Sequence, residues 1–420
     1  MNICRLCKSS TEIFLDLGKV SLPEEFRTAQ TRAAPLTKYE LSLAYCKTCL
    51  HVQLGYKVPP DVIYKNASNY FYDYSVTVTG KTHWQALVID TLPHLTHNDL
   101  IVDIGCNTGI LLDLFGQTGK GVRVLGVDPA SHLVVHAKAK GIPVIENYFT
   151  PLVAEQIFKK YGLAQLVTCT NVLDHVDDLG EFMQALVKIL DTRGVFIVEV
   201  PYFYRMLTQL THIPYHQQID YMMLVPFMSF LRQFDLSLFD AEEMDIHGGS
   251  IRMYIGKGKI AATKRLAGQI QKEKKIYKDY AKKLLRFKSK VQKQRDTFRN
   301  FIQKAKVAKK TIAGIGASAK GITLLNYCGF GHEAIDFISE KSPLKIGRFT
   351  PSQIPIVSDD FLLKKDPDYA ILLAWNFSKE ITNHFLKQKQ LKTQYILPIP
   401  KFTLLSLTGK KRKLASRAKR

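Results

Sequence analysis

Four of the seven cysteines have the spacing of metal ligands. They form two Cys-x-x-Cys pairs separated by 38 residues, at positions Cys4, Cys7, Cys46 and Cys49. Two such turns present four thiolates to a tetrahedral ion, and soft sulfur in a closed four-ligand shell favours structural zinc. An iron ion of the rubredoxin type fits the same spacing, whereas two disulfides would require an oxidising compartment. The pattern predicts a small N-terminal domain, residues 1–69, that depends on zinc to fold.

A glycine turn follows an apolar strand predicted at residues 100–104. The loop reads Asp103-Ile104-Gly105-Cys106-Asn107-Thr108-Gly109. Its glycines allow a tight turn and let the backbone approach a ligand before the predicted helix at 110–115. The next predicted strand, 122–127, ends at Asp128, where a carboxylate can accept hydrogen bonds from both hydroxyls of a ribose. The loop and the acidic strand end together predict a nucleoside-type cofactor.

Two cofactors fit a glycine turn that is followed by an acidic strand end: a dinucleotide and S-adenosylmethionine. A dinucleotide fingerprint has the spacing GxGxxG and places the pyrophosphate at the helix N-terminus. The spacing here is GxxxG, and Asp103 stands two residues before the first glycine. The pattern therefore favours S-adenosylmethionine, and the candidate cofactor residues are Asp103, Gly105, Asn107, Thr108, Gly109, Asp128 and Asn171.

The elements that must hold this loop alternate between apolar strands and helical segments, as they do in a βαβ sheet. Further strands are predicted at 166–170 and 194–200, and an antiparallel hairpin is predicted from 239–244 with 250–254. Together they predict an α/β fold, with the seven-stranded, mostly parallel sheet of a class I methyltransferase. The predicted organisation is a zinc-binding domain (1–69), a methyltransferase core (70–256), a basic linking helix (257–310), a Rossmann-like domain (311–407) and a basic tail (408–420).

The C-terminal third contains a second glycine turn, Gly314-Ile315-Gly316-Ala317-Ser318-Ala319-Lys320-Gly321, after an apolar strand predicted at 311–315. Two interpretations stay open. The glycines could simply let a helix pack closely on the strand, or the turn and its lysine could meet a phosphate. On the second interpretation the candidate substrate contacts are Gly316, Ser318, Lys320 and Arg348.

The charge of the 420-residue chain is unevenly distributed. The formal net charge is +22, but residues 257–310 carry +17 and the tail 408–420 carries +7, so the rest of the chain is near neutral. A solvated helical face and a basic tail account for this pattern, with attraction of an anionic ligand or surface as the alternative. We therefore do not expect a nucleic-acid partner. No apolar run is long enough to cross a membrane and no secretory signal begins the sequence, which predicts a cytoplasmic protein.

Ordered sequence matches extend over nearly the whole chain and identify a resemblance to the sugar C-methyltransferases. The matching segments are CRLC, YCKTCLHVQLGY, YFYDYS, VDIGCNTGILL, NVLDHV, EVPYF, HGGSIRMYI, GIGASAKGITLLNYCG, LKIGRFTPSQIPI and AILLAWNF. The resemblance implies a zinc-binding domain, a methyltransferase core and a Rossmann-like domain. It also implies S-adenosylmethionine as donor and a nucleotide-linked 4-keto hexose as substrate, whose methylated product would enter polysaccharide or secondary-metabolite biosynthesis.

The resembling enzymes use a histidine as base in a Tyr-His-Glu-His stretch after the fifth strand. The corresponding residues here are Tyr215, His216, Gln217 and Gln218, so neutral amides replace the glutamate and the base. The resemblance also implies that His175 and a tyrosine-rich segment with Tyr72 line the sugar site.

This difference leaves three alternatives for the chemistry. Proton removal could pass to His216, His175 or a tyrosine such as Tyr72. The enzyme could methylate oxygen, or it could bind donor and sugar without efficient turnover. C-methylation of a nucleotide-linked keto-deoxysugar is the function that we expect, ahead of O-methylation, of a binding-only protein and of a nucleic-acid-binding methyltransferase.

Overall fold

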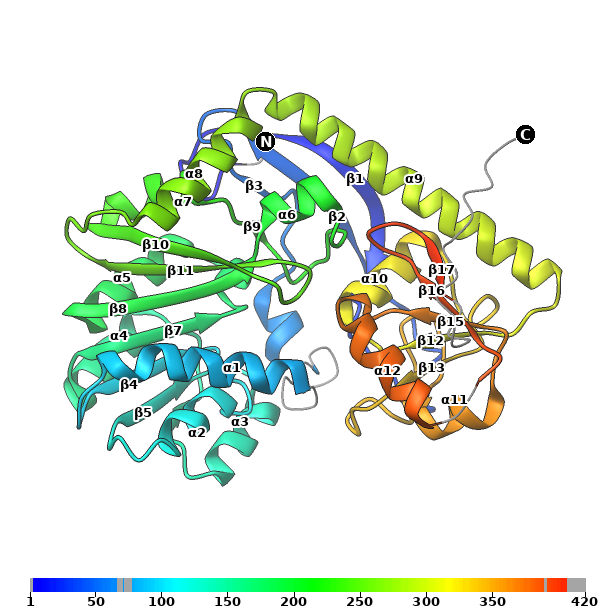
Figure 1. Cartoon of the computed structure of the whole chain (residues 1–420), viewed down its shortest axis with the longest axis horizontal. Coiled ribbons are helices and arrows are strands. Elements are labelled where there is room, and N and C mark those ends of the chain that lie inside the picture. Colours follow the sequence, from blue (N-terminus) through cyan, green and yellow to red (C-terminus); the bar gives the residue numbers. More distant parts are fainter. Residues whose placement is uncertain (1–2, 66–70, 72–77, 389–390, 406–420) are drawn as a thin grey trace. The chain divides into compact units, whose positions relative to one another are not determined.

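The computed structural model describes residues 3–65, 71, 78–388 and 391–405, and it divides into two compact units (Figure 1). The first unit contains Met1–Leu22 and Lys38–Lys290, and the second contains Pro23–Thr37 and Val291–Arg420. The chain therefore enters the second unit twice, the first time through a short segment near its N-terminus.

The first unit is built around a seven-stranded sheet with the order β10-β11-β8-β7-β4-β5-β6. Strands β8, β7, β4, β5 and β6 run parallel, whereas β11 pairs antiparallel with β8 and with β10. This is the predicted class I methyltransferase sheet, including its closing hairpin. The strands are β4 (Leu100–Ile104), β5 (Arg123–Val127), β6 (Val144–Ile145), β7 (Ala164–Thr170), β8 (Leu190–Pro201), β10 (Leu236–Met244) and β11 (Ser250–Lys257).

Burial on both faces explains why the central strands are continuously apolar. All five residues of β4 are buried, as expected for a parallel strand that is covered by helices on both sides. The helices of this unit are α1 (Val78–Thr91), α2 (Ile110–Gly116), α3 (Ser131–Ala139), α4 (Pro151–Tyr161), α5 (Leu179–Ile189), α6 (Phe203–Gln209), α7 (Leu224–Leu231) and α8 (Lys264–Tyr277). Short 3₁₀ turns lie at Leu92–His94, Leu173–His175 and Arg232–Phe234, and a π-helical turn lies at Asp61–Lys65.

A second, smaller sheet carries the cysteines. Its order is β1-β2-β3-β9, with strands β1 (Thr11–Ser21), β2 (Lys38–Cys46), β3 (Val52–Leu54) and β9 (Asp220–Tyr221). The strand β9 comes from the middle of the chain and pairs antiparallel with β3. The cysteine-bearing segment is thus joined through backbone hydrogen bonds to the methyltransferase core.

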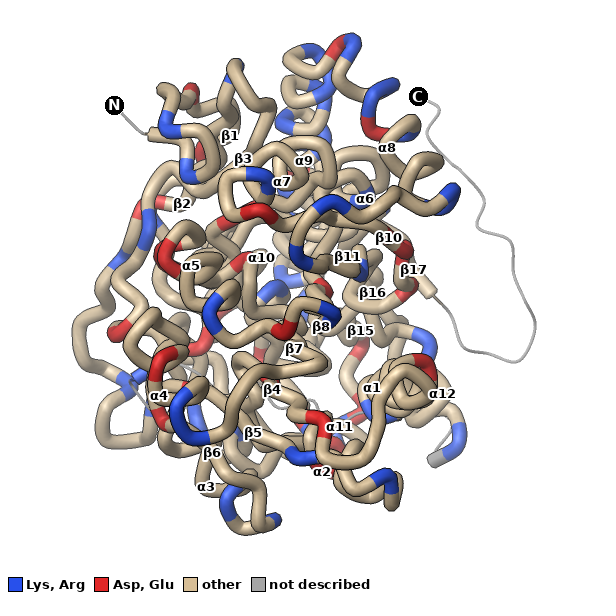
Figure 2. The backbone as a smooth tube through the Cα atoms, turned by 90° about the vertical axis from the view of Figure 1, so that its left-hand side faces the viewer, with Lys and Arg blue, Asp and Glu red and all other residues tan. Residues whose placement is uncertain are grey.

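The basic segment 257–310 forms two helices where a single linking helix was predicted. Helix α8 ends at Tyr277, and α9 (Tyr280–Val307) follows after Lys278 and Asp279. Aspartate is favoured at a helix N-cap, and the carbonyl of Asp279 accepts a hydrogen bond from the amide of Lys283, so α9 starts anew there. Lys and Arg recur through the sequences of both helices, and blue segments mark several of them in the upper part of Figure 2.

The second unit is a six-stranded sheet with the order β14-β13-β12-β15-β16-β17, parallel except for β17. This doubly wound order is Rossmann-like, as predicted. Its strands are β12 (Ile312–Ile315), β13 (Phe337–Glu340), β14 (Ile356–Ser358), β15 (Tyr369–Leu372), β16 (Gln394–Leu397) and β17 (Thr403–Leu405). Its helices are α10 (Ala319–Cys328), α11 (Asp359–Lys365) and α12 (Ser378–Gln388), with a 3₁₀ turn at Trp375–Phe377.

Residues 23–37 are anchored to this second unit by specific contacts. Arg27 and Phe349 exchange backbone hydrogen bonds of 2.8 Å, and the ammonium group of Lys345 lies 3.3 Å from a carboxylate oxygen of Glu24.

Among the helices that the structure describes, none has both the length and the apolar character that a membrane span requires.

Candidate active site

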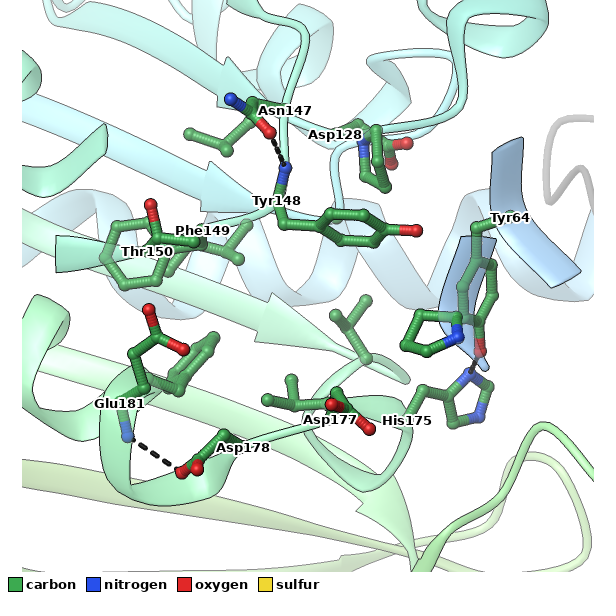
Figure 3. A pocket seen from close by; sticks show the side chains of 18 of the residues that line it. Tyr64, Asp128, Asn147, Tyr148, Phe149, Thr150, His175, Asp177, Asp178 and Glu181 are labelled. Carbon is green, nitrogen blue, oxygen red and sulfur yellow. Dashed lines mark hydrogen bonds between the residues drawn. The ribbon is translucent and has the colours of Figure 1, made fainter. Parts of the chain in front are cut away.

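A cavity of about 290 Å³ opens at the carboxyl ends of β4, β5 and β7 (Figure 3). This edge is where open parallel sheets bind ligands, at the point where strand order reverses. The lining residues come from the ends of these strands, from the loop after β6, from the start of α5 and from the π-helical turn. They include Asp61, Tyr64, Gly105, Asp128, Asn147, Tyr148, Phe149, Asn171, His175, Asp177, Asp178 and Glu181.

Asp128 holds the predicted glycine turn in place. One carboxylate oxygen accepts the amide of Asn107 and the other accepts the amide of Ala130, both at 2.8 Å. Burial raises the pKa of Asp128, and the two amide hydrogen bonds oppose that shift. Each carboxylate oxygen has a second lone pair. The side chain lines the cavity and can therefore still accept hydrogen bonds from a ribose.

The glycines of the turn have a steric role as well. Gly105 has a φ of 77°, and a Cβ there would lie 2.3 Å from a methyl group of Val172. Gly109 has a φ of 73°, and a Cβ there would lie 2.8 Å from side-chain atoms of Ala137 and Ile142. Of these two glycines, Gly105 lies in the cavity wall and Gly109 packs the turn against its neighbours.

Of the remaining predicted cofactor residues, one lines the cavity and three do not. Asn171 lines the cavity, and its side-chain amide nitrogen is buried without a hydrogen-bond partner. Asn107 and Thr108 are not among the lining residues. Asp103 is buried behind the turn and accepts a hydrogen bond of 2.7 Å from Thr168. Burial raises the pKa of Asp103 to about 7.

The cavity wall is acidic. Five carboxylates line it, from Asp61, Asp128, Asp177, Asp178 and Glu181, and none of the described lining residues is a lysine or arginine. Lys65 and Lys57 pair with the acids at positions 61 and 177 from outside the cavity, at 3.1 and 2.5 Å. Such a wall attracts a cationic ligand and repels an anionic one.

His175 is the predicted catalytic residue that the structure places in this wall. Its Nδ1 atom lies 3.1 Å from the hydroxyl oxygen of Tyr64, and its Nε2 atom lies 3.5 Å from a carboxylate oxygen of the buried Asp174. A carboxylate beside Nε2 favours the tautomer with hydrogen on Nε2, and Nδ1 then accepts the Tyr64 hydroxyl. Sequence reasoning missed Tyr64, because its partner is 111 residues away along the chain.

Four of the other predicted catalytic residues lie outside the lining of this cavity. Tyr215, His216, Gln217 and Gln218 are all buried and are not lining residues, although the ring of Tyr215 packs edge-on to His175 at 6.4 Å. The side-chain oxygen of Gln218 lies 3.0 Å from Nε2 of His212, a second residue that sequence reasoning missed. Tyr72 lies outside the described residues.

The environment of His216 is unsuited to a base. Its Nε2 atom lies 3.4 Å from the carbonyl oxygen of Tyr39, and its ring packs against the ring of the same tyrosine. Burial lowers the pKa of His216 to about 4.

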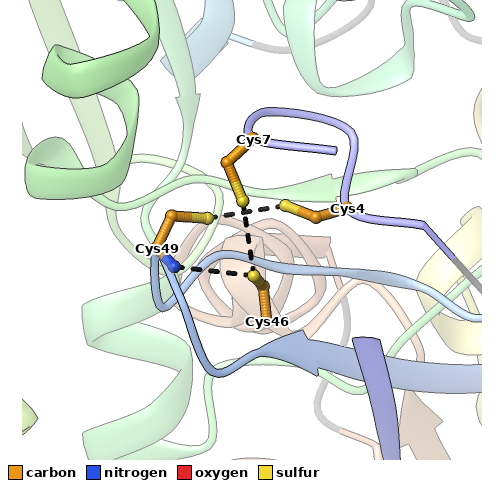
Figure 4. Close-up of side chains that lie close together, drawn as sticks. All are labelled: Cys4, Cys7, Cys46 and Cys49. Carbon is orange, nitrogen blue, oxygen red and sulfur yellow. Dashed lines mark hydrogen bonds between the residues drawn. The ribbon is translucent and has the colours of Figure 1, made fainter. Parts of the chain in front are cut away.

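The four predicted metal ligands point at a common centre (Figure 4). Their sulfur atoms all lie within 4.8 Å of one another, with Cys4 3.4 Å from Cys49 and Cys7 3.5 Å from Cys46. A regular tetrahedron with metal–sulfur bonds of about 2.3 Å separates its sulfurs by about 3.8 Å. The observed separations exceed the S–S bond length of about 2.05 Å, so the group fits a tetrahedral ion better than it fits two disulfides.

The two cysteine turns have the same shape. In the first, the amide of Lys8 donates to the carbonyl of Cys4, and in the second the amide of Leu50 donates to the carbonyl of Cys46. Lys8 and Leu50 have φ values of 63° and 69°. Such matched turns are how two Cys-x-x-Cys motifs bring four thiolates to one centre.

The predicted substrate contacts lie in the second unit. Gly316, Ser318 and Lys320 follow β12, at the point where strand order reverses, and Arg348 precedes β14. Ser318 caps α10 by accepting the amide of Gly321, and it donates to the carbonyl of Leu373. These four contacts stay predictions.

Two observations favour a packing role for this second glycine turn. A Cβ at Gly321 would lie 2.6 Å from the carbonyl oxygen of Leu373. The amide of Ala317, which would face a phosphate, already donates to the carboxylate of Glu340 at 2.9 Å.

The sheet order, the acidic cavity beside a glycine turn and the thiolate cluster define a class I methyltransferase with a metal-binding N-terminal segment. Three family models match the chain: "Putative zinc binding domain" over residues 4–64, "Methyltransferase domain" over 80–238 and "C-methyltransferase C-terminal domain" over 245–400.

The C-methyltransferase NovU of Streptomyces niveus is 31% identical to this chain in an alignment of 420 positions, which covers 96% of this chain and 96% of that protein. The chain belongs to this C-methyltransferase family, and it is an S-adenosylmethionine-dependent methyltransferase.

Two further similarities cover parts of the chain. The ubiquinone biosynthesis O-methyltransferase of Pectobacterium carotovorum is 32% identical over 96 residues, or 22% of this chain and 39% of that protein. A solved S-adenosylmethionine-dependent methyltransferase from Clostridium acetobutylicum covers 45% of this chain and 93% of its own, with 14% identity and a TM-score of 0.34.

Proposed function

We propose that this C-methyltransferase binds its donor in the acidic cavity and methylates a carbon beside the keto group of a nucleotide-linked deoxysugar. The donor supplies an electrophilic methyl group on a positively charged sulfur. The carboxylates of the wall, of which those of Asp61 and Asp177 are paired with lysines, complement that charge and would repel the pyrophosphate of a dinucleotide. This charge distribution supports the choice of donor that the GxxxG spacing suggested.

The residues of the wall can hold each part of such a ligand. The free lone pairs of Asp128 can accept the ribose hydroxyls, and the rings of Tyr148 and Phe149 offer an apolar face to the adenine. The unpartnered amide nitrogen of Asn171 can donate to a ligand acceptor, which would relieve the cost of burying it.

The hydrogen bond between Tyr64 and His175 in the cavity wall carries the catalytic part of the proposal. In this scheme the tyrosine oxygen takes the proton from the carbon beside the ketone, while the phenol proton passes to Nδ1 of His175. Asp174 stabilises the imidazolium cation that results, and the electron pair stays on the substrate as an enolate. His175 thus replaces the base that Gln218 cannot supply, whereas His216 is buried elsewhere with a lowered pKa.

We further propose that the ion at the thiolate cluster is structural zinc. Four sulfur ligands fill a tetrahedral shell and leave no position for a substrate. The cluster would then stabilise the fold and not take part in methyl transfer.

Solvent-deuterium exchange at the carbon beside the ketone tests the proposed proton transfer separately from methylation. The wild type is incubated with a 4-keto sugar nucleotide and S-adenosylhomocysteine, which cannot donate a methyl group. We expect exchange that falls by about 10² to 10⁴-fold in Tyr64→Phe and in His175→Gln. His136→Gln on the exposed face of α3 is the matched control and should exchange like the wild type.

Two results would contradict the scheme. Unchanged exchange in both Tyr64→Phe and His175→Gln would show that another group is the base. Absence of exchange in the wild type, together with transfer of a methyl group to a sugar hydroxyl, would establish the O-methylation alternative.

A further inference from the structure

The cysteine turns contact more than their own metal centre. Arg5 stands between Cys4 and Cys7, and its Nε lies 3.0 Å from both carboxylate oxygens of Asp220. His51, two residues after Cys49, places its Nε2 2.8 Å from the same carboxylate. Asp220 is fully buried on β9. The two turns therefore converge on one side chain of the methyltransferase core.

Arg5 also holds the wall of the donor cavity. Its two terminal nitrogens donate to the backbone carbonyls of Val176 and Asp177, at 2.6 and 2.9 Å. Both of these residues line the cavity, directly after His175. A guanidinium presents its donors in a rigid planar fork, so the position of Arg5 fixes the positions of both carbonyls relative to Asp220.

The segment around Asp220 is tied to the same wall from the other side. The amide of Ile219 donates to the carbonyl of Asp174 at 2.8 Å, and the amide of Leu54 on β3 donates to the carbonyl of Ile219. Gln53, the antiparallel partner of Asp220, accepts the backbone amide of Arg5 at 2.8 Å. Hydrogen bonds thus connect the first cysteine turn, β3, β9 and residues 174–177 to one another.

We propose that Arg5 is a positioning residue, through which the cysteine centre sets the geometry of the donor-cavity wall at residues 174–177. The proposal rests on the proposed function only in taking this cavity as the donor site. Arg5 is not among the described residues that line the cavity, so its effect passes through the carbonyls of Val176 and Asp177. An ion held by the four cysteines would influence methyl transfer only indirectly, by fixing the turn that carries Arg5.

The test compares Arg5→Lys with Lys47→Gln. Lys47 occupies the same position in the second cysteine turn, but it is exposed and pairs with Glu12 in a contact of 2.5 Å. A lysine at position 5 keeps the positive charge but lacks the planar fork of guanidinium donors that contacts Asp220 and the two carbonyls. Three quantities are measured: bound metal, the dissociation constant of S-adenosylmethionine by calorimetry, and hydrogen–deuterium exchange of segment 171–182 against segment 100–104.

We expect Arg5→Lys to retain its metal, to bind the donor about tenfold more weakly and to exchange segment 171–182 at least several-fold faster, with segment 100–104 unchanged. Lys47→Gln should match the wild type throughout. Donor affinity and exchange equal to the wild type in metal-loaded Arg5→Lys would overturn the proposal.

A second variant keeps the test decisive where Arg5→Lys loses its metal. Asp220→Asn lies outside the cysteine turns and removes the charge that anchors Arg5. It should loosen segment 171–182 in the same way, and an unchanged segment would overturn the proposal. The exchange measurement needs no donor, so a wild type that fails to bind S-adenosylmethionine would refute the proposed donor site while the role of Arg5 is still tested.

Discussion

The substitution Asp128→Asn tests the donor site most sharply, because it keeps the shape of the side chain and removes one acceptor. The carboxylate accepts the amides of Asn107 and Ala130 at 2.8 Å, one on each oxygen. In the variant one of these amides would face an NH₂ group. A buried donor that loses its acceptor costs about 1 to 3 kcal/mol, so the free energy of unfolding should fall by that amount.

Donor affinity should fall as well. A hydrogen bond to a charged acceptor is worth about 1.5 to 3 kcal/mol, so losing one ribose contact should raise the dissociation constant by roughly 10 to 150-fold. Calorimetry with S-adenosylmethionine and S-adenosylhomocysteine measures this directly. The control is Asp99→Asn, because Asp99 accepts a backbone amide from Thr96 at the opposite end of β4. Unchanged donor affinity in Asp128→Asn, or tighter binding of NAD than of the donor by the wild type, would refute the assignment.

Three further predictions concern the metal, a buried acid and the second glycine turn. Elemental analysis should find roughly one equivalent of zinc in the wild type and none in Cys46→Ser. Such sites contribute about 10 to 16 kcal/mol to folding, so a wild type that is folded without metal would contradict this prediction. Burial raises the pKa of Asp103 to about 7, so this side chain binds its proton more tightly in the folded state than in the unfolded state. Its contribution to stability is therefore present below pH 4 and is lost as the pH rises to 7. In urea titrations, Asp103→Asn should therefore be more stable than the wild type at pH 8 by roughly 2 to 4 kcal/mol and should lack this pH dependence. Equal stability of the two proteins at pH 8 would argue against a raised pKa. Gly321→Ala should destabilise the second unit by about 1 to 3 kcal/mol in thermal unfolding, because its Cβ would meet the carbonyl of Leu373 at 2.6 Å, whereas an unchanged transition would disprove the packing role.

Features set by local spacing could be predicted from the sequence. Cys4, Cys7, Cys46 and Cys49 converge as their spacing indicated, and β4, its glycine turn and Asp128 lie in the predicted order. The reason is physical: a Cys-x-x-Cys turn and an apolar strand followed by glycine each determine their shape within a few residues.

Contacts between distant segments could not be predicted in this way. The fork of Arg5 meets residues 171 to 215 positions away, and the hydroxyl of Tyr64 meets an imidazole 111 positions away. No periodicity encodes such pairs, because they depend on how the cysteine-bearing segment joins the methyltransferase core, where β3 pairs with β9. An arginine inside a cysteine turn was the one local signal available, and its partner could not be read from the sequence.

Transfer of a ¹³C-labelled methyl group from S-adenosylmethionine to a 4-keto sugar nucleotide tests the central claim most directly. The product is analysed by carbon NMR, which distinguishes a methyl group coupled to a ring carbon from one attached to oxygen. We predict a carbon–carbon bond beside the ketone, formed by the wild type and by His136→Gln and strongly reduced in Tyr64→Phe and His175→Gln. A methyl group on a hydroxyl oxygen, or no transfer to any 4-keto sugar nucleotide by a protein that binds the donor, would contradict the account.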